Sequence, residues 1–197
     1  MYHHKAPHRN WMPNIKHLDL YKNDTLPVPD NFYDDYKNRG SAAKEQDMEI
    51  KNMYMSFDMK LDPNTFVDST ETGTGGSKTW DAVYDWKYSY NQMSEKQKKE
   101  WDKHYQPISK AFYESSYSDS AFAEWKYQRY IKDYLRCIVS VDENLGRMIE
   151  YLKSTGEWDN TLVIYTSDQG FFLGEHGWYD KRFMYEESLI TPFIMKL

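Results

Sequence analysis

Side chains suited to binding a metal ion and an anionic group lie close together near the carboxyl end of the sequence. Asp168 and Gln169 directly follow an apolar segment, and His176 and Lys181 come soon after them. A carboxylate and an amide carbonyl are hard oxygen donors of the kind that bind Ca²⁺ or Mg²⁺. Lysine supplies a compact cation, and imidazole exchanges protons near neutral pH. These residue types indicate a site for an anion beside a divalent metal ion.

The same residues also have ordinary structural interpretations. The carboxylate of Asp168 would only cap the backbone of its own turn, as aspartate does in many loops. Lys181 would be a solvated surface lysine, the usual state of a lone lysine. The residue types alone therefore leave both interpretations open.

A helix followed by a strand is expected to position these residues. Residues 161–166 alternate and are rich in β-branched and aromatic types, which predicts a strand that ends just before Asp168. From about residue 121 to 154, apolar residues recur at spacings of three and four, which is typical of an amphipathic helix. Gly156 supplies its stop. Because ligands bind beyond the carboxyl ends of strands in open α/β sheets, the sequence predicts an α/β fold in which a long amphipathic helix leads into a metal-site strand.

The rest of the chain gives weaker patterns. Four prolines predict extended, loop-like backbone over residues 1–31. Residues 41–57 are expected to be helical, and the glycine-rich stretch 62–79 is expected to be a surface loop. Ser94 and Gln97 form a capping-box pattern before a short polar helix, and Pro107 is expected to open another helix.

Composition narrows the class of protein. The chain has 197 residues, enough for one domain, and its net charge of −6 argues against a general nucleic-acid binder. No apolar run is long enough to span a membrane. No signal-peptide pattern follows Met1, which says nothing about secretion of a parent protein if the chain begins within a domain. The single cysteine, Cys137, excludes a disulfide framework and is expected to be a small buried hydrophobe.

Three motifs together resemble the sulfatase family of the alkaline-phosphatase-like superfamily. They are Asp168-Gln169-Gly170, the "LGEHG" of residues 173–177, and "DKRFMYEES" from Asp180. The segment "HHKAPHRNWMP" at residues 3–13 is similar to the family's Pro-His segment, which places an imidazole near the sulfate. The residues of these motifs are most similar to those of carbohydrate sulfatases, a group that includes N-acetylglucosamine-6-sulfatases. The resemblance therefore implies part of a sulfatase-like catalytic domain.

The resemblance also implies roles for particular residues. Asp168 and Gln169 would bind the metal, Ca²⁺ or alternatively Mg²⁺. Lys181 would contact the sulfate as a catalytic and substrate-binding residue, and its neighbour Arg182 would not. His8 would bind the sulfate or protonate the leaving oxygen. His176 would line the substrate pocket, with Glu175 either orienting it or anchoring the loop.

Two parts that the sulfatase family carries are not identified in this sequence. The family carries a Cys or Ser in a C/S-x-P-x-R motif, which is oxidised to formylglycine, and an Asp-Asp pair that completes the calcium site. Cys137 is not followed by Pro and Arg at the required offsets. We expect both parts upstream of residue 1, so that residues 1–197 form the second half of the catalytic domain. In addition, Ile190 stands where the family usually has Arg.

The implied reaction is hydrolysis of a sulfate ester, with a sulfated glycan as the favoured substrate class. In the family's scheme an aldehyde hydrate attacks sulfur while the metal and the lysine neutralise the charge of the sulfate. The resemblance implies a secreted, periplasmic or lysosomal protein. One alternative is a phosphonate or phosphodiester hydrolase of the same superfamily. Another is an inactive, non-enzymatic remnant, which the missing nucleophile and Ile190 favour for the chain by itself.

Overall fold

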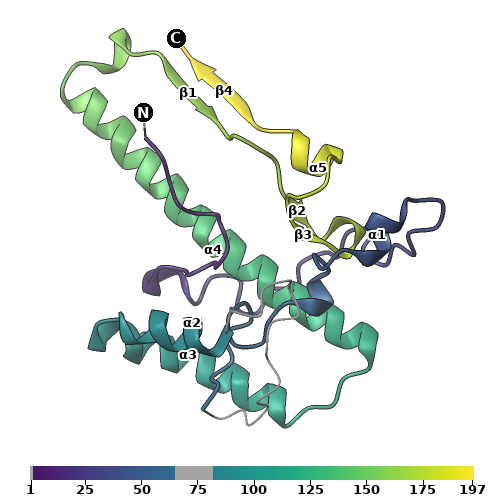
Figure 1. Ribbon diagram of the computed structural model, residues 1–197. Helices are drawn as coiled ribbons and strands as arrows, with labels where there is room; N and C mark the ends of the chain where they lie inside the picture. The colour runs from purple at the N-terminus through teal and green to yellow at the C-terminus, as the bar shows by residue number, and fades with distance from the viewer. Residues whose placement is uncertain (1, 65–81) are drawn as a thin grey trace.

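The computed structural model describes residues 2–64 and 82–197, and a single long helix runs through it (Figure 1). This helix, α4, spans Asp119–Ser154, and the Ser118 hydroxyl accepts a hydrogen bond from the amide of Ala121 at its start. The chain leaves the helix through Gly156, which has a φ of 75°. Glycine adopts that left-handed conformation without steric cost. The helix predicted over residues 121–154, and its glycine stop, are therefore confirmed.

The second long helix, α3, spans Glu95–Tyr113 and follows α2 (Ala82–Asn91). Its predicted capping box is present, because the side chains and amides of Ser94 and Gln97 bond reciprocally. The prediction of a new helix at Pro107 is wrong, since α3 continues through that residue. Trp101 and Tyr105 before the proline and Ser109 after it are all buried. Packing of one continuous face thus outweighs the main-chain hydrogen bond lost at the proline.

The helix predicted over residues 41–57 is also wrong. Only α1 (Ser41–Glu45) and the 3₁₀ turn η2 (Ile50–Asn52) form there. The backbone after α1 pairs with a distant segment, because the amide of Tyr179 donates to the carbonyl of Met48 at 3.0 Å. Tertiary pairing here overrides local helix preference. The extended region is confirmed for residues 2–31, where only η1 (Ile15–His17) is helical. The surface loop predicted for residues 62–79 lies almost entirely outside the described residues.

Two small antiparallel sheets complete the described chain. After the turn η3 (Trp158–Asn160), β1 (Val163–Thr166) pairs with β4 (Phe193–Lys196), with Val163 opposite Lys196 and Thr166 opposite Phe193. Strands β2 (Phe172–Leu173) and β3 (Tyr179–Asp180) form a hairpin around the turn η4 (Glu175–Gly177). The short helix α5 (Glu186–Leu189) precedes β4. The strand predicted over residues 161–166 is confirmed.

The main core lies against the first half of α4. It joins buried side chains from the amino-terminal segment, the turns after α1, α4 and β3; they are Trp11, Phe32, Ile50, Met53, Met55, Met59, Leu61, Tyr127, Tyr130, Ile131, Cys137 and Tyr179. Cys137 is the small buried hydrophobe expected from the sequence, and burial raises the pKa of its thiol to about 11. No helix in the described part of the chain is long and apolar enough to cross a membrane.

A group of charges is buried inside this core. The Asp133 carboxylate of α4 lies 2.7 Å from Arg136 and 3.2 Å from Lys60, and it accepts a hydrogen bond from the Tyr105 hydroxyl at 3.1 Å. Burial alone would raise the pKa of Asp133, but Lys60, Arg129 and Arg136 together lower it to about 2. The carboxylate therefore stays charged inside the protein.

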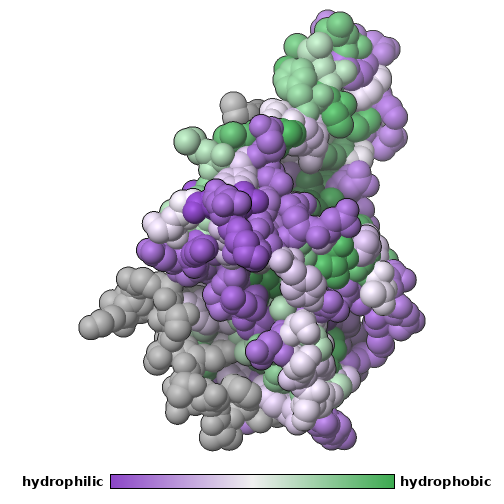
Figure 2. Space-filling view, turned by 90° about the vertical axis from the view of Figure 1, so that its right-hand side faces the viewer, coloured by the Kyte–Doolittle hydropathy of each residue, from purple (hydrophilic) through white to green (hydrophobic). Residues whose placement is uncertain are grey.

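The β1–β4 ribbon, in contrast, is apolar on both faces and exposed. Hydrophobic side chains gather on the upper projection of the molecule (Figure 2), at the height where β1 and β4 lie in Figure 1. The exposed apolar residues in and beside the two strands are Leu162, Ile164, Tyr165, Phe193, Ile194, Met195 and Leu197. Strands with such continuous apolar runs are usually covered on both faces.

Candidate functional site

The loop after β1 carries Asp168 and Gln169, as the sequence predicted. Ser167 makes the local turn contacts, because its hydroxyl donates to the carbonyl of Gln169 at 2.8 Å. Asp168 is exposed, and its Oδ1 accepts a hydrogen bond from the Ser167 hydroxyl at 3.4 Å, but within the described residues no backbone amide and no cation is recorded against its carboxylate. The capping role considered for Asp168 thus belongs to Ser167. The Asp168 carboxylate remains available to an external cation.

Gly170 fixes this loop against α5. Its amide donates to the carbonyl of Ser188 at 2.9 Å. A Cβ at position 170 would lie 2.2 Å from the Glu187 carbonyl oxygen and 2.6 Å from that of Ile190. Only glycine fits such an approach of two backbones. The Asp-Gln-Gly motif therefore needs its glycine for packing.

The donor chemistry of this loop fits a hard divalent cation, although two donors are too few to complete a site. Asp168 and Gln169 offer the oxygen ligands that Ca²⁺ and Mg²⁺ take, and Ca²⁺ takes six to eight of them. Across residues 2–64 and 82–197, no group of three or more His, Cys, Asp or Glu side chains is arranged to hold a metal ion.

Lys181 and Arg182 follow β3 and differ in exposure. The buried Asp180 carboxylate lies 3.6 Å from the Lys181 Nζ and 2.9 Å from the Arg182 Nε. The Lys181 side chain is 23% exposed and lies over the Phe171 ring, whereas the Arg182 side chain is 69% exposed. Lys181 is therefore held in place from two sides, and Arg182 extends into solvent.

His8 lies on the surface between two anchored neighbours. Its Nδ1 contacts the carbonyl oxygen of Arg9, so in the neutral ring Nδ1 carries the proton and Nε2 is the acceptor. On one side, the Trp11 indole donates to the carbonyl of Pro7 at 2.7 Å. On the other side, the Arg9 guanidinium forms an ion pair with Asp58. The imidazole is thus exposed on a well-anchored backbone.

His176 is buried inside a set of polar and aromatic contacts. Its Nδ1 lies 2.7 Å from Asp34 Oδ2, and its Nε2 lies 3.8 Å from Glu187 Oε1. The Tyr36 hydroxyl donates to its carbonyl at 2.7 Å. Although burial opposes it, the amide of Tyr36 and the ring of His176 hold the pKa of Asp34 below its usual value. The ring is therefore oriented by Asp34.

Glu175 anchors the loop, which is one of the two roles that the sequence left open for it. Its Oε2 accepts the amide of Leu173 at 2.6 Å, which closes the turn between β2 and β3. The carboxylate that contacts His176 comes instead from Asp34, in the segment "FYDDY". Sequence reasoning did not identify this contact, because Asp34 and His176 are 142 residues apart.

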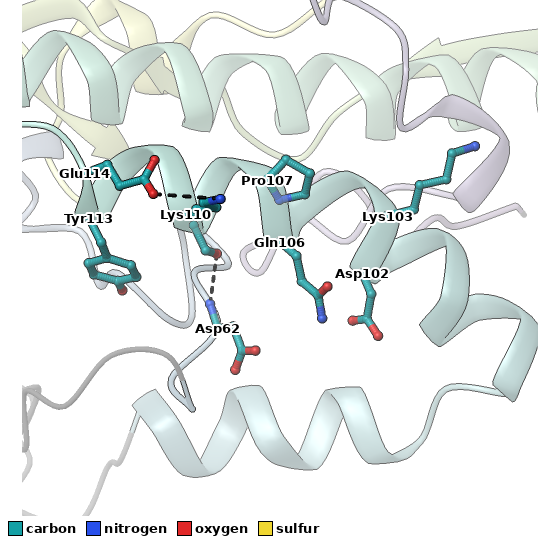
Figure 3. A pocket seen from close by; sticks show the side chains of 9 residues that line it. Asp62, Asp102, Lys103, Gln106, Pro107, Lys110, Tyr113 and Glu114 are labelled. Atoms are coloured by element: carbon teal, nitrogen blue, oxygen red, sulfur yellow. Dashed lines mark hydrogen bonds and ion pairs between the residues drawn. The ribbon is translucent and has the colours of Figure 1, made fainter.

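A separate pocket of about 700 Å³ lies along α3 (Figure 3). Its lining includes Asp62, Asp102, Gln106, Lys110 and Glu114, and an ion pair of 3.9 Å joins the last two. None of the residues predicted from the sequence to bind metal or substrate lines it. The predicted site and this pocket are therefore different places on the molecule.

Comparison with known proteins gives a consistent picture. The family model described as Sulfatase matches residues 2–197. The N-acetylglucosamine-6-O-sulfatase of Bacteroides thetaiotaomicron is 44% identical over 197 residues, which is 100% of this chain and 33% of that protein. The multifunctional alkaline phosphatase superfamily protein PehA of Trinickia caryophylli is 43% identical over 63 residues, 32% of this chain and 12% of that protein.

A solved structure extends the likeness to three dimensions. It was determined in complex with its substrate, D-glucosamine-2-N,6-O-disulfate, and it superposes with a TM-score of 0.85 at 44% identity. The match covers 100% of this chain and 38% of that one. The chain thus spans about a third of the length of the curated relative and of the solved structure it matches over its whole length.

Proposed function

Because this chain belongs to the sulfatase family, we propose that it is the second part of a catalytic domain that hydrolyses a sulfate ester of a glycan. The observation that carries the proposal is the match of the whole chain, in sequence and in fold, to one continuous third of a sulfatase. The α/β fold expected from the sequence is confirmed by the same match.

The exposed β1–β4 ribbon supports the partial domain. A two-stranded ribbon is marginally stable in water by itself, and here Ile164 is 49% and Phe193 68% exposed. Further strands beside the ribbon, and layers over its faces, would bury these side chains. We propose that the remaining part of the domain supplies them.

The proposed substrate is a glucosamine residue of a glycan that carries a 6-O-sulfate. The support comes from the relative named as an N-acetylglucosamine-6-O-sulfatase and from the solved structure bound to a 6-O-sulfated glucosamine. An anionic substrate agrees with the chemistry of Lys181 and His8.

Each of the proposed site residues has a distinct task. Lys181 would hold a sulfate oxygen and stabilise the charge that develops as the S–O bond breaks. His8 would bind the sulfate or, in its protonated form, donate from Nε2 to the leaving oxygen. His176, oriented by Asp34, would line the substrate pocket.

Asp168 and Gln169 would hold a divalent cation, preferably Ca²⁺. When bound, such a cation neutralises charge on the sulfate. Cys137, by contrast, does not fit a formylglycine precursor, because it is buried in the helix α4 and because Val139 and Val141 stand where the motif has Pro and Arg. A formylglycine would therefore have to come from outside this chain.

One observation favours a second candidate function. The relative from Trinickia caryophylli is described as a multifunctional member of the alkaline phosphatase superfamily. Hydrolysis of a phosphodiester or phosphonate is therefore the second candidate for the whole protein.

The test uses the full-length protein that contains this chain, supplied with Ca²⁺, and the 197-residue chain alone. Release of sulfate from glucosamine-6-sulfate is compared with hydrolysis of an aryl phosphodiester. With the full-length protein we expect sulfate release to be faster than hydrolysis of the phosphodiester. Soluble preparations of the isolated chain should release no sulfate, because the chain lacks a covalent nucleophile of the required kind. A full-length protein that hydrolyses only the phosphodiester supports the second candidate, and one that hydrolyses neither supports an inactive remnant.

A further inference from the structure

The guanidinium of Arg9, the residue after His8, is held in a clamp that consists of the Asp58 carboxylate and three aromatic rings. Its Nε donates to Asp58 Oδ1 at 2.7 Å, and its Nη2 donates to Asp58 Oδ2 at 2.5 Å. The Asp58 carboxylate is fully buried, and its Oδ2 also accepts the amide of Tyr54 at 2.8 Å. A bidentate arginine–carboxylate pair fixes orientation as well as distance.

Aromatic rings enclose the same guanidinium. The Arg9 Cζ lies 5.4 Å from the centroids of both Tyr54 and Phe57, and 5.0 Å from that of Tyr179. A guanidinium within about 6 Å of a ring face is attracted to it. Arg9 is therefore held both by an ion pair and by rings, and the Tyr179 ring comes from a different element, β3.

Tyr179 connects this clamp to Lys181. Tyr179 and Asp180 form β3, and the Asp180 carboxylate lies 3.6 Å from the Lys181 Nζ. The Trp11 ring also packs near Tyr179, with ring centroids 6.4 Å apart. Arg9 and Trp11, which anchor the backbone around His8, thus both contact the ring of Tyr179, two positions before Lys181.

The clamp is in turn joined to the long helix. The Lys60 ammonium donates to the carbonyl of Asp58 at 2.8 Å and lies 3.2 Å from the Asp133 carboxylate of α4. Buried charges are costly unless they are paired, and here two ion pairs, Arg9–Asp58 and Lys60–Asp133, are joined through the backbone carbonyl of Asp58. The His8 segment is therefore attached to the long helix α4.

We propose that Arg9 is a positioning residue that sets His8 relative to Lys181 through the Asp58 pair and the Tyr179 ring. This inference rests on the proposed sulfatase function. It concerns His8 and Lys181, which are 173 positions apart in the sequence. Arg9 itself does not touch the substrate in this scheme. Lysine cannot replace it, because an ammonium cannot bind both carboxylate oxygens and present a flat face to a ring at the same time.

The test is a double-mutant cycle in the full-length protein. Arg9→Lys is made in the wild-type and the His8→Ala backgrounds, and kcat and KM for glucosamine-6-sulfate are measured for all four proteins. Arg9→Lys alone is expected to lower kcat/KM about 10- to 100-fold, the cost of misplacing a catalytic group by an ångström or less. In the His8→Ala background the same substitution should change kcat/KM less than about threefold, because the group it positions is already absent.

Trp86→Leu is the control for a general loss of stability. Trp86 is buried in α2, where its ring stacks on that of Tyr90, and neither residue belongs to the His8 segment or to the clamp around Arg9. Its substitution should lower Tm, and its effect on kcat/KM should be the same in both backgrounds. Tyr179→Leu, which removes the shared ring and keeps the ion pair, provides a second route and should behave like Arg9→Lys.

The outcomes separate this inference from the proposed function. Equal effects of Arg9→Lys in the two backgrounds, or no effect on kcat/KM, would overturn the positioning role. So would loss of folding by both Arg9→Lys and Tyr179→Leu, since it would assign the clamp to stability alone. A wild-type protein without sulfatase activity would instead contradict the proposed function.

Discussion

The amide of Gly170 donates a hydrogen bond to the carbonyl oxygen of Ser188 at 2.9 Å, so that the loop of Asp168 and Gln169 rests directly on α5. The contact joins the loop of the predicted metal ligands to the helix that follows Lys181. A change that separates these backbones should therefore disturb stability and site geometry together.

Gly170→Ala should destabilise the full-length protein. The new Cβ would lie 2.2 Å from the Glu187 carbonyl oxygen, and relieving such a contact in a packed region costs about 1–3 kcal/mol or more. The control is Gly146→Ala in α4, where nothing lies within 4 Å of the added Cβ and where alanine favours the helix by up to about 1 kcal/mol. Urea unfolding should therefore show opposite signs for the two variants. A neutral Gly170→Ala would mean that α5 can move away from the loop.

Lys181→Ala should reduce turnover far more than Arg182→Ala. Loss of a cation that stabilises the developing charge on the sulfate costs on the order of 3 kcal/mol, or about 100-fold in kcat/KM. Arg182 is 69% exposed, so solvent screens its ion pair with the buried Asp180 carboxylate, and its loss should cost little turnover. Steady-state kinetics of the full-length variants checks this. A larger loss for Arg182→Ala would place the sulfate contact one residue further along.

Asp168→Ala should abolish stabilisation of the full-length protein by Ca²⁺. A ligand that binds only the folded state raises Tm, and removal of one charged donor weakens a calcium site strongly. Thermal unfolding with Ca²⁺ and with a chelator gives the comparison. Asp159→Ala, a change at another acidic residue close to β1, should keep the full Ca²⁺ effect. Identical Ca²⁺ responses of Asp168→Ala and wild type would remove Asp168 from the ligand set.

The stability of the protein should fall with acid between about pH 6.5 and pH 4 because of His104. Burial, assisted by the nearby Arg136 and Arg129, lowers the pKa of His104 to about 4. The folded state then binds fewer protons than the unfolded state below pH 6.5, so protons favour unfolding. The loss is at most roughly 3.5 kcal/mol, at about 1.4 kcal/mol per pKa unit. His104→Phe should flatten this part of the urea-derived pH profile, and a variant profile parallel to that of the wild type would refute the assignment.

Local patterns predicted the elements that follow from spacing and capping. The long helix, its stop at Gly156, the Ser94–Gln97 capping box and the strand before Asp168 each depend on residues a few positions apart. The errors arose where distant segments decide. The pairing of Met48 with Tyr179 prevents a helix over residues 41–57, and a continuous buried face carries α3 through Pro107.

The site shows the same division. The motifs predicted the loop that carries Asp168 and Gln169. The larger role of Lys181 than of Arg182 in turnover remains a prediction for experiment. The partners that orient the predicted residues were not visible in the sequence. Asp34 contacts His176 across 142 residues, and Asp58 pairs with Arg9 across 49 residues. Neither pair has a local signal, because only the folded core brings its members together.

The exposed β1–β4 ribbon has a consequence for how the protein reaches its native state. Its strands lie near the carboxyl end of the chain and carry apolar side chains on both faces, and among residues 2–64 and 82–197 no further strand pairs with the outer edge of either one. Such a segment is a template for adding strands from other molecules until its own neighbours cover it. We therefore expect the 197-residue chain produced by itself to accumulate in inclusion bodies and to bind amyloid-reactive dyes. Charged substitutions at Ile164 and Ile194 should restore its solubility, because they place gatekeeper charges in both strands.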